Sequence, residues 1–105
     1  MKVLMMPKYA KHKPGDKVYF VPTPVKKIVN LKMFVVYEAT VYQSAARTEN
    51  GAVTSIYYML EVRRGYDDPQ YVVTTDDYIF KDEYTAGLYA IGASNSYEKD
   101  IAVMG

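Results

Sequence analysis

Two stretches in the middle of the chain alternate apolar and polar side chains. They run from Phe34 to Gln43 and from Thr54 to Arg64, and Asn50-Gly51 lies between them. Such alternation is typical of strands that bury one face. Asn-Gly favours a type I′ turn, because both central residues of that turn need φ > 0. The pattern therefore predicts a β-hairpin that turns at Asn50-Gly51.

The register that this turn sets sorts the hairpin side chains onto two faces, one apolar and one carrying rings and charges. A slip of one residue would move every side chain to the other face and destroy the sorting. The alternative is a flexible loop over residues 44–55, with the strands paired elsewhere. The predicted pairs are Val41 with Leu60 and Ala39 with Val62 on the apolar face, and Tyr42 with Met59, Thr40 with Glu61 and Glu38 with Arg63 on the outer face.

Turn signals and β-branched runs predict further strands on both sides of the hairpin. Pro14-Gly15-Asp16 precedes a strand from Lys17 to Val21 that places Val18 and Phe20 on one face. Gln70 to Thr75 is β-branched and predicts another strand. A third segment, residues 78–80, is either a short strand or a helical turn.

After residue 82 the apolar spacing becomes helical. Tyr84, Leu88 and Ile91 stand at i, i+4 and i+7, so we expect them to face the core. Gly92 is placed to end the helix. The sequence therefore predicts one short helix, followed by a loosely held tail over residues 93–105; the alternative is that Ile101, Val103 and Met104 add an edge strand.

Length and composition favour one small domain. The 105 residues can build a modest core, and no apolar run approaches the roughly 18 residues that span a bilayer. Residues 1–6 are too short for the apolar region of a signal peptide. The chain has no cysteine, which agrees with a reducing compartment. We therefore expect a cytoplasmic protein without disulfides or cysteine metal sites.

Charge and tyrosine are distributed unevenly. Residues 1–36 carry eight lysines and one acidic residue, whereas residues 37–105 carry five basic and eleven acidic residues. This imbalance marks either a surface for nucleic acid or an acidic partner, or internal neutralisation. The chain also holds 12 tyrosines, 3 phenylalanines and no tryptophan. Tyrosine suits binding surfaces, and it equally suits the thin, half-exposed faces of a small barrel.

The order of these segments resembles the SH3-like small barrels of short bacterial and phage proteins. The resemblance rests on residues 14–20, on Ala39-Thr40-Val41, on a tyrosine-rich strand, and on residues 78–86 with their Ile-Phe pair and following helix. Thr85 stands where an acidic residue is usual before the alanine. The resemblance implies a mainly β fold, an SH3-like small antiparallel barrel with one short helix near the C-terminus. Within a single domain of residues 1–105, we expect a basic N-terminal arm or edge strand over 1–13, the barrel and helix over 14–92, and the tail over 93–105.

No group of residues in the sequence carries recognisable chemistry. The carboxylate pairs at 67–68, 76–77 and 82–83 are adjacent residues, which point away from each other on a strand, so they favour solvated turns over a metal site. Glycine-rich phosphate loops are absent. His12, the only histidine, lies between Lys11 and Lys13 and is expected to be solvated on a basic arm. We therefore predict no enzymatic activity, no catalytic residue, no metal and no cofactor.

The predicted function is that of a non-catalytic binding module. The resemblance adds a phage or mobile-element accessory protein in the host-cell cytoplasm, directed at a host or structural protein, and self-association is an open variant. The alternative is a nucleic-acid-associated accessory protein that uses the basic N-terminal third. We expect neither a membrane partner nor a small-molecule substrate. The candidate protein-binding residues are Tyr42, Tyr57, Met59, Arg47, Arg63 and Arg64, and the candidate nucleic-acid-binding residues are Lys8, Tyr9, Lys11, Lys13, Lys17 and Tyr19.

Overall fold

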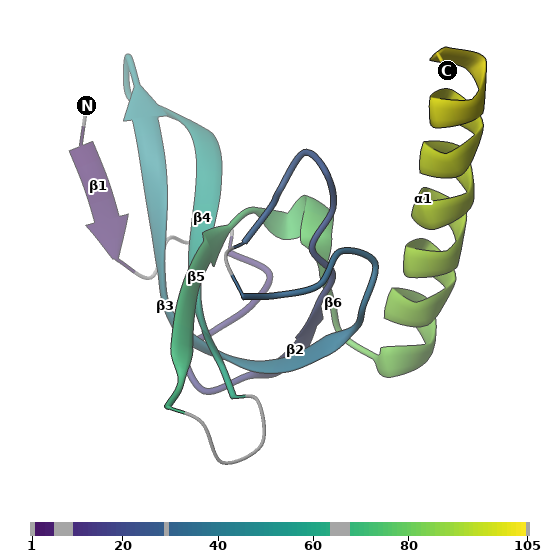
Figure 1. Ribbon diagram of the computed structural model, residues 1–105. Coiled ribbons are helices and arrows are strands. Elements are labelled where there is room, and N and C mark those ends of the chain that lie inside the picture. Colours follow the sequence, from purple (N-terminus) through teal and green to yellow (C-terminus); the bar gives the residue numbers. More distant parts are fainter. Residues whose placement is uncertain (1, 6–9, 29, 64–67, 105) are drawn as a thin grey trace.

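The structure is a computed structural model that describes residues 2–5, 10–28, 30–63 and 68–104. It is a mainly β protein with one C-terminal helix (Figure 1). The helix α1 stands beside the sheet, and the segment that follows β2 arches between the two. The elements are β1 (Lys2–Met5), β2 (Lys17–Phe20), β3 (Tyr37–Glu49), β4 (Ala52–Val62), β5 (Gln70–Thr74), the 3₁₀ turn η1 (Asp76–Tyr78), β6 (Ile79–Phe80) and α1 (Glu83–Met104).

The six strands form one antiparallel sheet in the order β5-β4-β3-β2-β6, and β1 pairs with β3. The long strand β3 organises this sheet. Its beginning pairs with β2, its end pairs with β1 along the same edge, and β4 follows its other edge. Among the described residues the two end strands, β5 and β6, do not pair with each other. The sheet is therefore open, so a closed barrel is not part of the described fold.

The predicted hairpin is confirmed. Asn50 and Gly51 have φ of 53° and 80°, the positive values that the turn requires. Val41 lies opposite Leu60 and Ala39 opposite Val62, as predicted. Leu60 and Val62 are completely buried, so the apolar face of the hairpin faces the core. The alternative of a flexible loop over residues 44–55 is wrong, because that segment forms the ends of β3 and β4.

Two register shifts change the middle of the hairpin. Met59 pairs with Gln43, which leaves Tyr42 as an extra residue in β3, so the predicted Tyr42–Met59 pair is wrong. A second shift, between Arg47 and Thr48, adds a residue to β4 and restores the predicted register at the turn. Each extra residue is a β-bulge, which local alternation does not reveal.

The predicted Glu38–Arg63 pair is also replaced. Glu38 Oε1 instead lies 3.2 Å from Lys17 Nζ on β2, and Glu61 Oε1 lies 3.3 Å from an Arg63 guanidinium nitrogen. β4 ends at Val62, opposite Ala39, so the ladder between β3 and β4 stops one residue before this pair.

The core lies against the inner face of the sheet. Val18 and Phe20 of β2 share one buried face, as predicted, and Tyr58 of β4 lies among them, fully buried. The turn before β2 also forms as predicted, with Gly15 at φ 95° and a hydrogen bond from Asp16 N to Lys13 O. Of the segment 78–80, Ile79 is the buried member.

The helix differs most from the sequence prediction. It is 22 residues long and continues through Gly92, so the predicted short helix and the loose tail over 93–105 are wrong. Gly92 does not end it because its φ is not positive, and a glycine in ordinary helical geometry lowers helix stability without breaking the helix. Asp82 caps the N-terminus, since Thr85 N and Thr85 Oγ1 donate to its carboxylate at 2.7 and 2.9 Å.

The buried face of α1 is also not the predicted one. Ala86 and Ala90 are buried against Val21, with Tyr89 packed beside them. Small alanine side chains let the helix lie close to the sheet. In contrast, Tyr84, Leu88 and Ile91 are 75%, 54% and 62% exposed on the opposite side. Within the described residues, no helix is both long and apolar enough to cross a membrane.

Candidate binding surfaces

The outer face of the sheet carries a group of exposed and half-buried apolar and tyrosine side chains across three strands. We call this group the sheet patch; it consists of Tyr42, Tyr57, Met59, Tyr71 and Val73. Register places Val73 of β5 beside Met59 of β4. Tyr42 and Tyr71 stack edge to face with ring centroids 5.4 Å apart, and these two rings are 54% and 50% exposed. Exposed apolar groups that adjoin in this way are typical of interaction sites.

The arginines predicted for this surface flank the sheet patch. Arg47 is exposed and lies opposite Ser55 toward the hairpin turn, whereas Arg63 follows the other end of β4 and pairs with Glu61. Arg64 lies outside the described residues. The structure therefore brings five of the six predicted protein-binding residues to one face. It adds Tyr71 and Val73, whose position depends on the pairing of β5 with β4.

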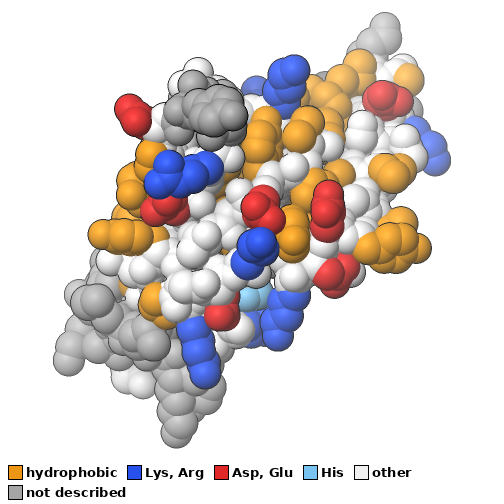
Figure 2. Space-filling model, turned by 90° about the horizontal axis from the view of Figure 1, so that it is seen from below, with side chains coloured by type: hydrophobic (Ala, Val, Ile, Leu, Met, Phe, Trp, Pro, Cys, Tyr) orange, Lys and Arg blue, Asp and Glu red, His pale blue; other side chains and the backbone are white. Residues whose placement is uncertain are grey.

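The residues of the nucleic-acid alternative are more scattered. Lys8 and Tyr9 lie outside the described residues, and Lys11 and Lys13 are exposed. The ammonium of Lys17 pairs with Glu38, which raises the pKa of Lys17 through a hydrogen bond. Tyr19 is half-buried against the helix side of the core. Figure 2 shows basic and acidic side chains interspersed over the face that it presents, without a large patch of one sign.

His12 lies in a buried polar cluster, so its predicted solvated position is wrong. It is 5% exposed, its ring meets that of Tyr58 edge to face at 5.1 Å, and its Nε2 lies 3.5 Å from Asp76 Oδ1. Lys11 N donates to the Tyr58 hydroxyl at 3.0 Å. Burial lowers the pKa of His12 and raises the pKa of Tyr58. Both side chains are therefore held neutral, and the cluster anchors residues 11–12 to the sheet.

The row of inward side chains beside Tyr58 is also polar. Ser44 and Thr74, its cross-strand neighbours, are 2% and 1% exposed. Ser44 Oγ and Asp76 Oδ1 are buried without a hydrogen bond to any described residue. Local patterns do not reveal this cluster, because His12 and Tyr58 lie 46 positions apart in the sequence and nothing local joins them. A substrate has little access to His12, since the imidazole is almost completely covered.

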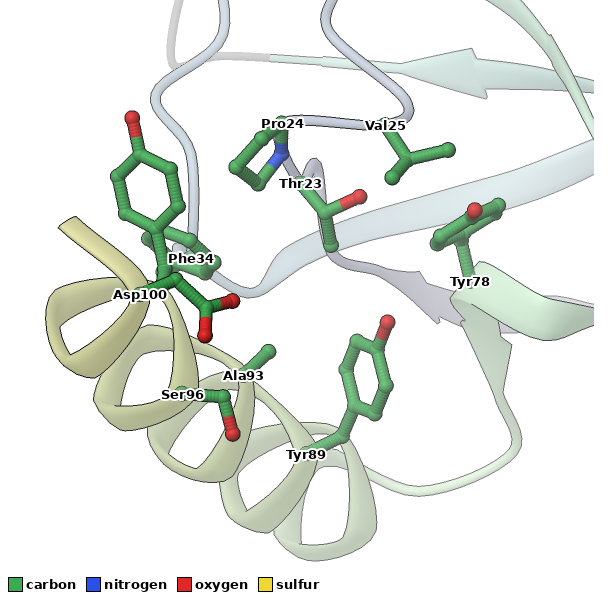
Figure 3. A pocket seen from close by; sticks show the side chains of 10 residues that line it. Thr23, Pro24, Val25, Phe34, Tyr78, Tyr89, Ala93, Ser96 and Asp100 are labelled. Carbon is green, nitrogen blue, oxygen red and sulfur yellow. The ribbon is translucent and has the colours of Figure 1, made fainter. Parts of the chain in front are cut away.

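A groove opens between α1 and the segment 23–34 (Figure 3). Its volume is about 340 Å³. Tyr89 and Ala93 of α1 form its floor in this view, Tyr78 of η1 lies to one side, and Phe34 and Asp100 lie to the other. Burial raises the pKa of Tyr89, so its hydroxyl remains protonated. This groove was not predicted from the sequence, because the predicted short helix ends before Asp100.

Comparisons with known proteins do not assign these surfaces. No protein family, no curated protein and no solved structure matches the chain. Within residues 10–28, 30–63 and 68–102, no three acidic or histidine side chains gather as a metal site would require.

Proposed function

We propose that the protein is a non-catalytic binding module whose sheet patch docks against a partner protein. The observation that supports this proposal is the stacked Tyr42–Tyr71 pair beside Val73, since each of these side chains leaves about half of its surface in water. Burying apolar surface stabilises a complex by about 25 cal/mol per Å² before the costs of association. Tyrosine and arginine commonly dominate interface energetics, and Arg47 and Arg63 border the patch.

The edge strand β5 adds a second means of attachment. It pairs with β4 alone among the described strands, and its five residues carry no charge and no proline. Charged residues and proline are the usual protection of an exposed sheet edge. A partner that covers the sheet patch can therefore also pair with the backbone of β5.

We also propose that the fold is of the SH3-like type. The antiparallel strand order and the 3₁₀ turn between β5 and β6 support this assignment, although the described sheet is open. A role as a phage or mobile-element accessory protein, directed at a host or structural protein, follows from that resemblance alone. Fold resemblance provides a prior on function and no partner identity.

Affinity capture from bacterial lysate with matched variants tests the proposal. Tyr42→Ala combined with Tyr71→Ala removes both stacked rings, whereas Tyr84→Ala removes a still more exposed ring from α1. We expect the double variant to lose the captured partner by at least about tenfold, because buried aromatic anchors are each worth about 2 kcal/mol or more. Tyr84→Ala should retain it. A partner that is indifferent to the double variant would refute the proposed surface.

The nucleic-acid alternative has one supporting observation, the adjacent exposed side chains of Lys11 and Lys13. It predicts binding to mixed-sequence DNA that weakens steeply between about 50 and 200 mM salt. The protein-binding proposal predicts little or no such binding. Lys11→Gln combined with Lys13→Gln would abolish the DNA signal under the alternative and leave protein capture intact under the main proposal.

A further inference from the structure

The groove between α1 and the segment 23–34 has walls of unusual composition. Four aromatic rings line it, and Asp100 is the only charged residue among the described residues at its surface. The rings belong to Phe34, Tyr78, Tyr89 and Tyr97. Lys26 and Lys27 lie on the same segment but do not line the groove. A ligand in this groove therefore meets ring faces and a single negative charge.

The carboxylate and the phenol hydroxyls of the groove have no hydrogen-bond or ion-pair partner within the described part of the chain, whereas Thr23 Oγ1 accepts a hydrogen bond from Lys26 N at 3.2 Å. Asp100 makes no ion pair or hydrogen bond there, and the same is true of the hydroxyls of Tyr78, Tyr89 and Tyr97. Figure 3 shows the Asp100 carboxylate at the same end of the groove as the Phe34 ring. Asp100 is exposed, so its negative charge can meet a cation that enters the groove from water.

Backbone strain also accompanies the groove. Phe34 has φ of 63°, a left-handed conformation that is rare for a bulky residue. A hydrogen bond from Phe34 N to Pro22 O at 2.8 Å holds this conformation, and the ring lies 5.6 Å from that of Tyr97. Strained residues are common where a side chain must be delivered to a ligand.

We propose that this groove binds a small organic ammonium, whose positive charge faces Asp100 and whose alkyl groups contact the aromatic rings. Ring faces attract cations, and clusters of aromatic side chains bind quaternary ammonium groups for this reason. The apolar walls select against strongly hydrated inorganic cations, and Asp100 repels anions. The volume of about 340 Å³ lies at the small end of the range for ligand sites, which fits a compact ligand. The site is separate from the sheet patch, so the two proposals stand or fall independently.

A matched pair of probes tests the proposal by two-dimensional NMR titration of the full chain. Choline carries the ammonium, and 3,3-dimethyl-1-butanol is its neutral isostere with carbon in place of nitrogen. We expect choline to cause saturable shifts at Tyr89, Tyr97 and Asp100, and the isostere to bind at least about fivefold more weakly. Equal binding of both probes would overturn the proposal.

Two variants on α1 test whether the charge of Asp100 contributes to binding or whether any change in the helix weakens it. Asp100→Asn should weaken choline binding at least about fivefold and leave binding of the isostere unchanged. Glu98→Gln removes an exposed charge from the same helix outside the groove and should change neither. Equal effects of the two variants would refute a role for Asp100. Circular dichroism of both variants checks that the helix is retained.

A third probe distinguishes the source of the ammonium. A free metabolite and a methylated lysine side chain present the same chemistry, so the titration is repeated with a short peptide that contains trimethyllysine. Tighter binding of choline assigns the groove to a free ligand, and tighter binding of the peptide assigns it to a modified protein. Failure of both probes to bind would reject the site.

Discussion

The hydroxyl of Tyr58 joins the segment before β2 to the sheet, and its removal tests the buried polar cluster. Tyr58→Phe keeps the ring and deletes the acceptor of the Lys11 N–H, 3.0 Å away. The bond is partly buried and Tyr58 itself is completely buried, so water replaces the lost acceptor only in part. An unsatisfied buried donor costs about 1 to 3 kcal/mol, so we expect a loss of stability of that size. For a domain of this length, the melting temperature should fall by about 4 °C or more.

Tyr37→Phe is the matched control. The Tyr37 hydroxyl also accepts a hydrogen bond from a backbone N–H, that of Lys32 at 2.8 Å, but this bond is exposed. Water can satisfy the freed donor, so the change should stay within about 0.5 kcal/mol. Urea unfolding followed by circular dichroism measures both variants, and the m-value should not change. Equal losses in the two variants would refute the reasoning that burial makes the Tyr58 bond costly.

Three further predictions follow from the polar cluster and the helix cap. Ser44→Ala should leave the urea midpoint unchanged or raise it, because Ser44 Oγ is buried without a hydrogen bond to a described residue; a large loss would contradict this. Burial lowers the pKa of His12 below 6.5, so the neutral imidazole stabilises the fold fully above about pH 6.5, and this stabilisation is lost as the pH falls. His12→Gln should therefore flatten the plot of unfolding free energy against pH below pH 6.5. An unchanged plot would contradict the role of His12. Asp82→Ala should lower the melting temperature and the helical signal, since Asp82 accepts from Thr85, whereas Asp82→Asn should retain most of both.

The central hairpin could be predicted from sequence because its determinants are local. Asn50-Gly51 supplies the positive φ values, and the alternation on either side sets which face is buried. The bulge at Tyr42 could not be predicted, because the second register shift compensates for it and the pairs at both ends of the hairpin stay the same. Pairing with β5 fixes which rings meet on the outer face, and no local pattern connects Tyr42 to Tyr71.

The buried face of α1 and the burial of His12 could not be predicted from the sequence, because both depend on tertiary contacts. Helical spacing of apolar residues occurs on two opposite faces of α1, and the sheet packs on the face that carries Ala86 and Ala90. The face that carries the alanines packs on the sheet because small side chains allow a close approach that Tyr84 and Leu88 would prevent. The buried position of His12 depends on contacts with Tyr58 and Asp76. These two residues are distant from His12 in sequence, so the contacts form only in the tertiary fold.

The central claim is that the sheet patch is the surface on which a partner docks, and site-specific photo-crosslinking tests it most directly. A photoreactive phenylalanine analogue replaces Tyr71 in one variant and Tyr84 in another, because both side chains are exposed but lie on different elements. Irradiation of producing cells should yield a discrete adduct with another protein chain from position 71 and none from position 84. An adduct from position 84 alone, or none from position 71, would contradict the account.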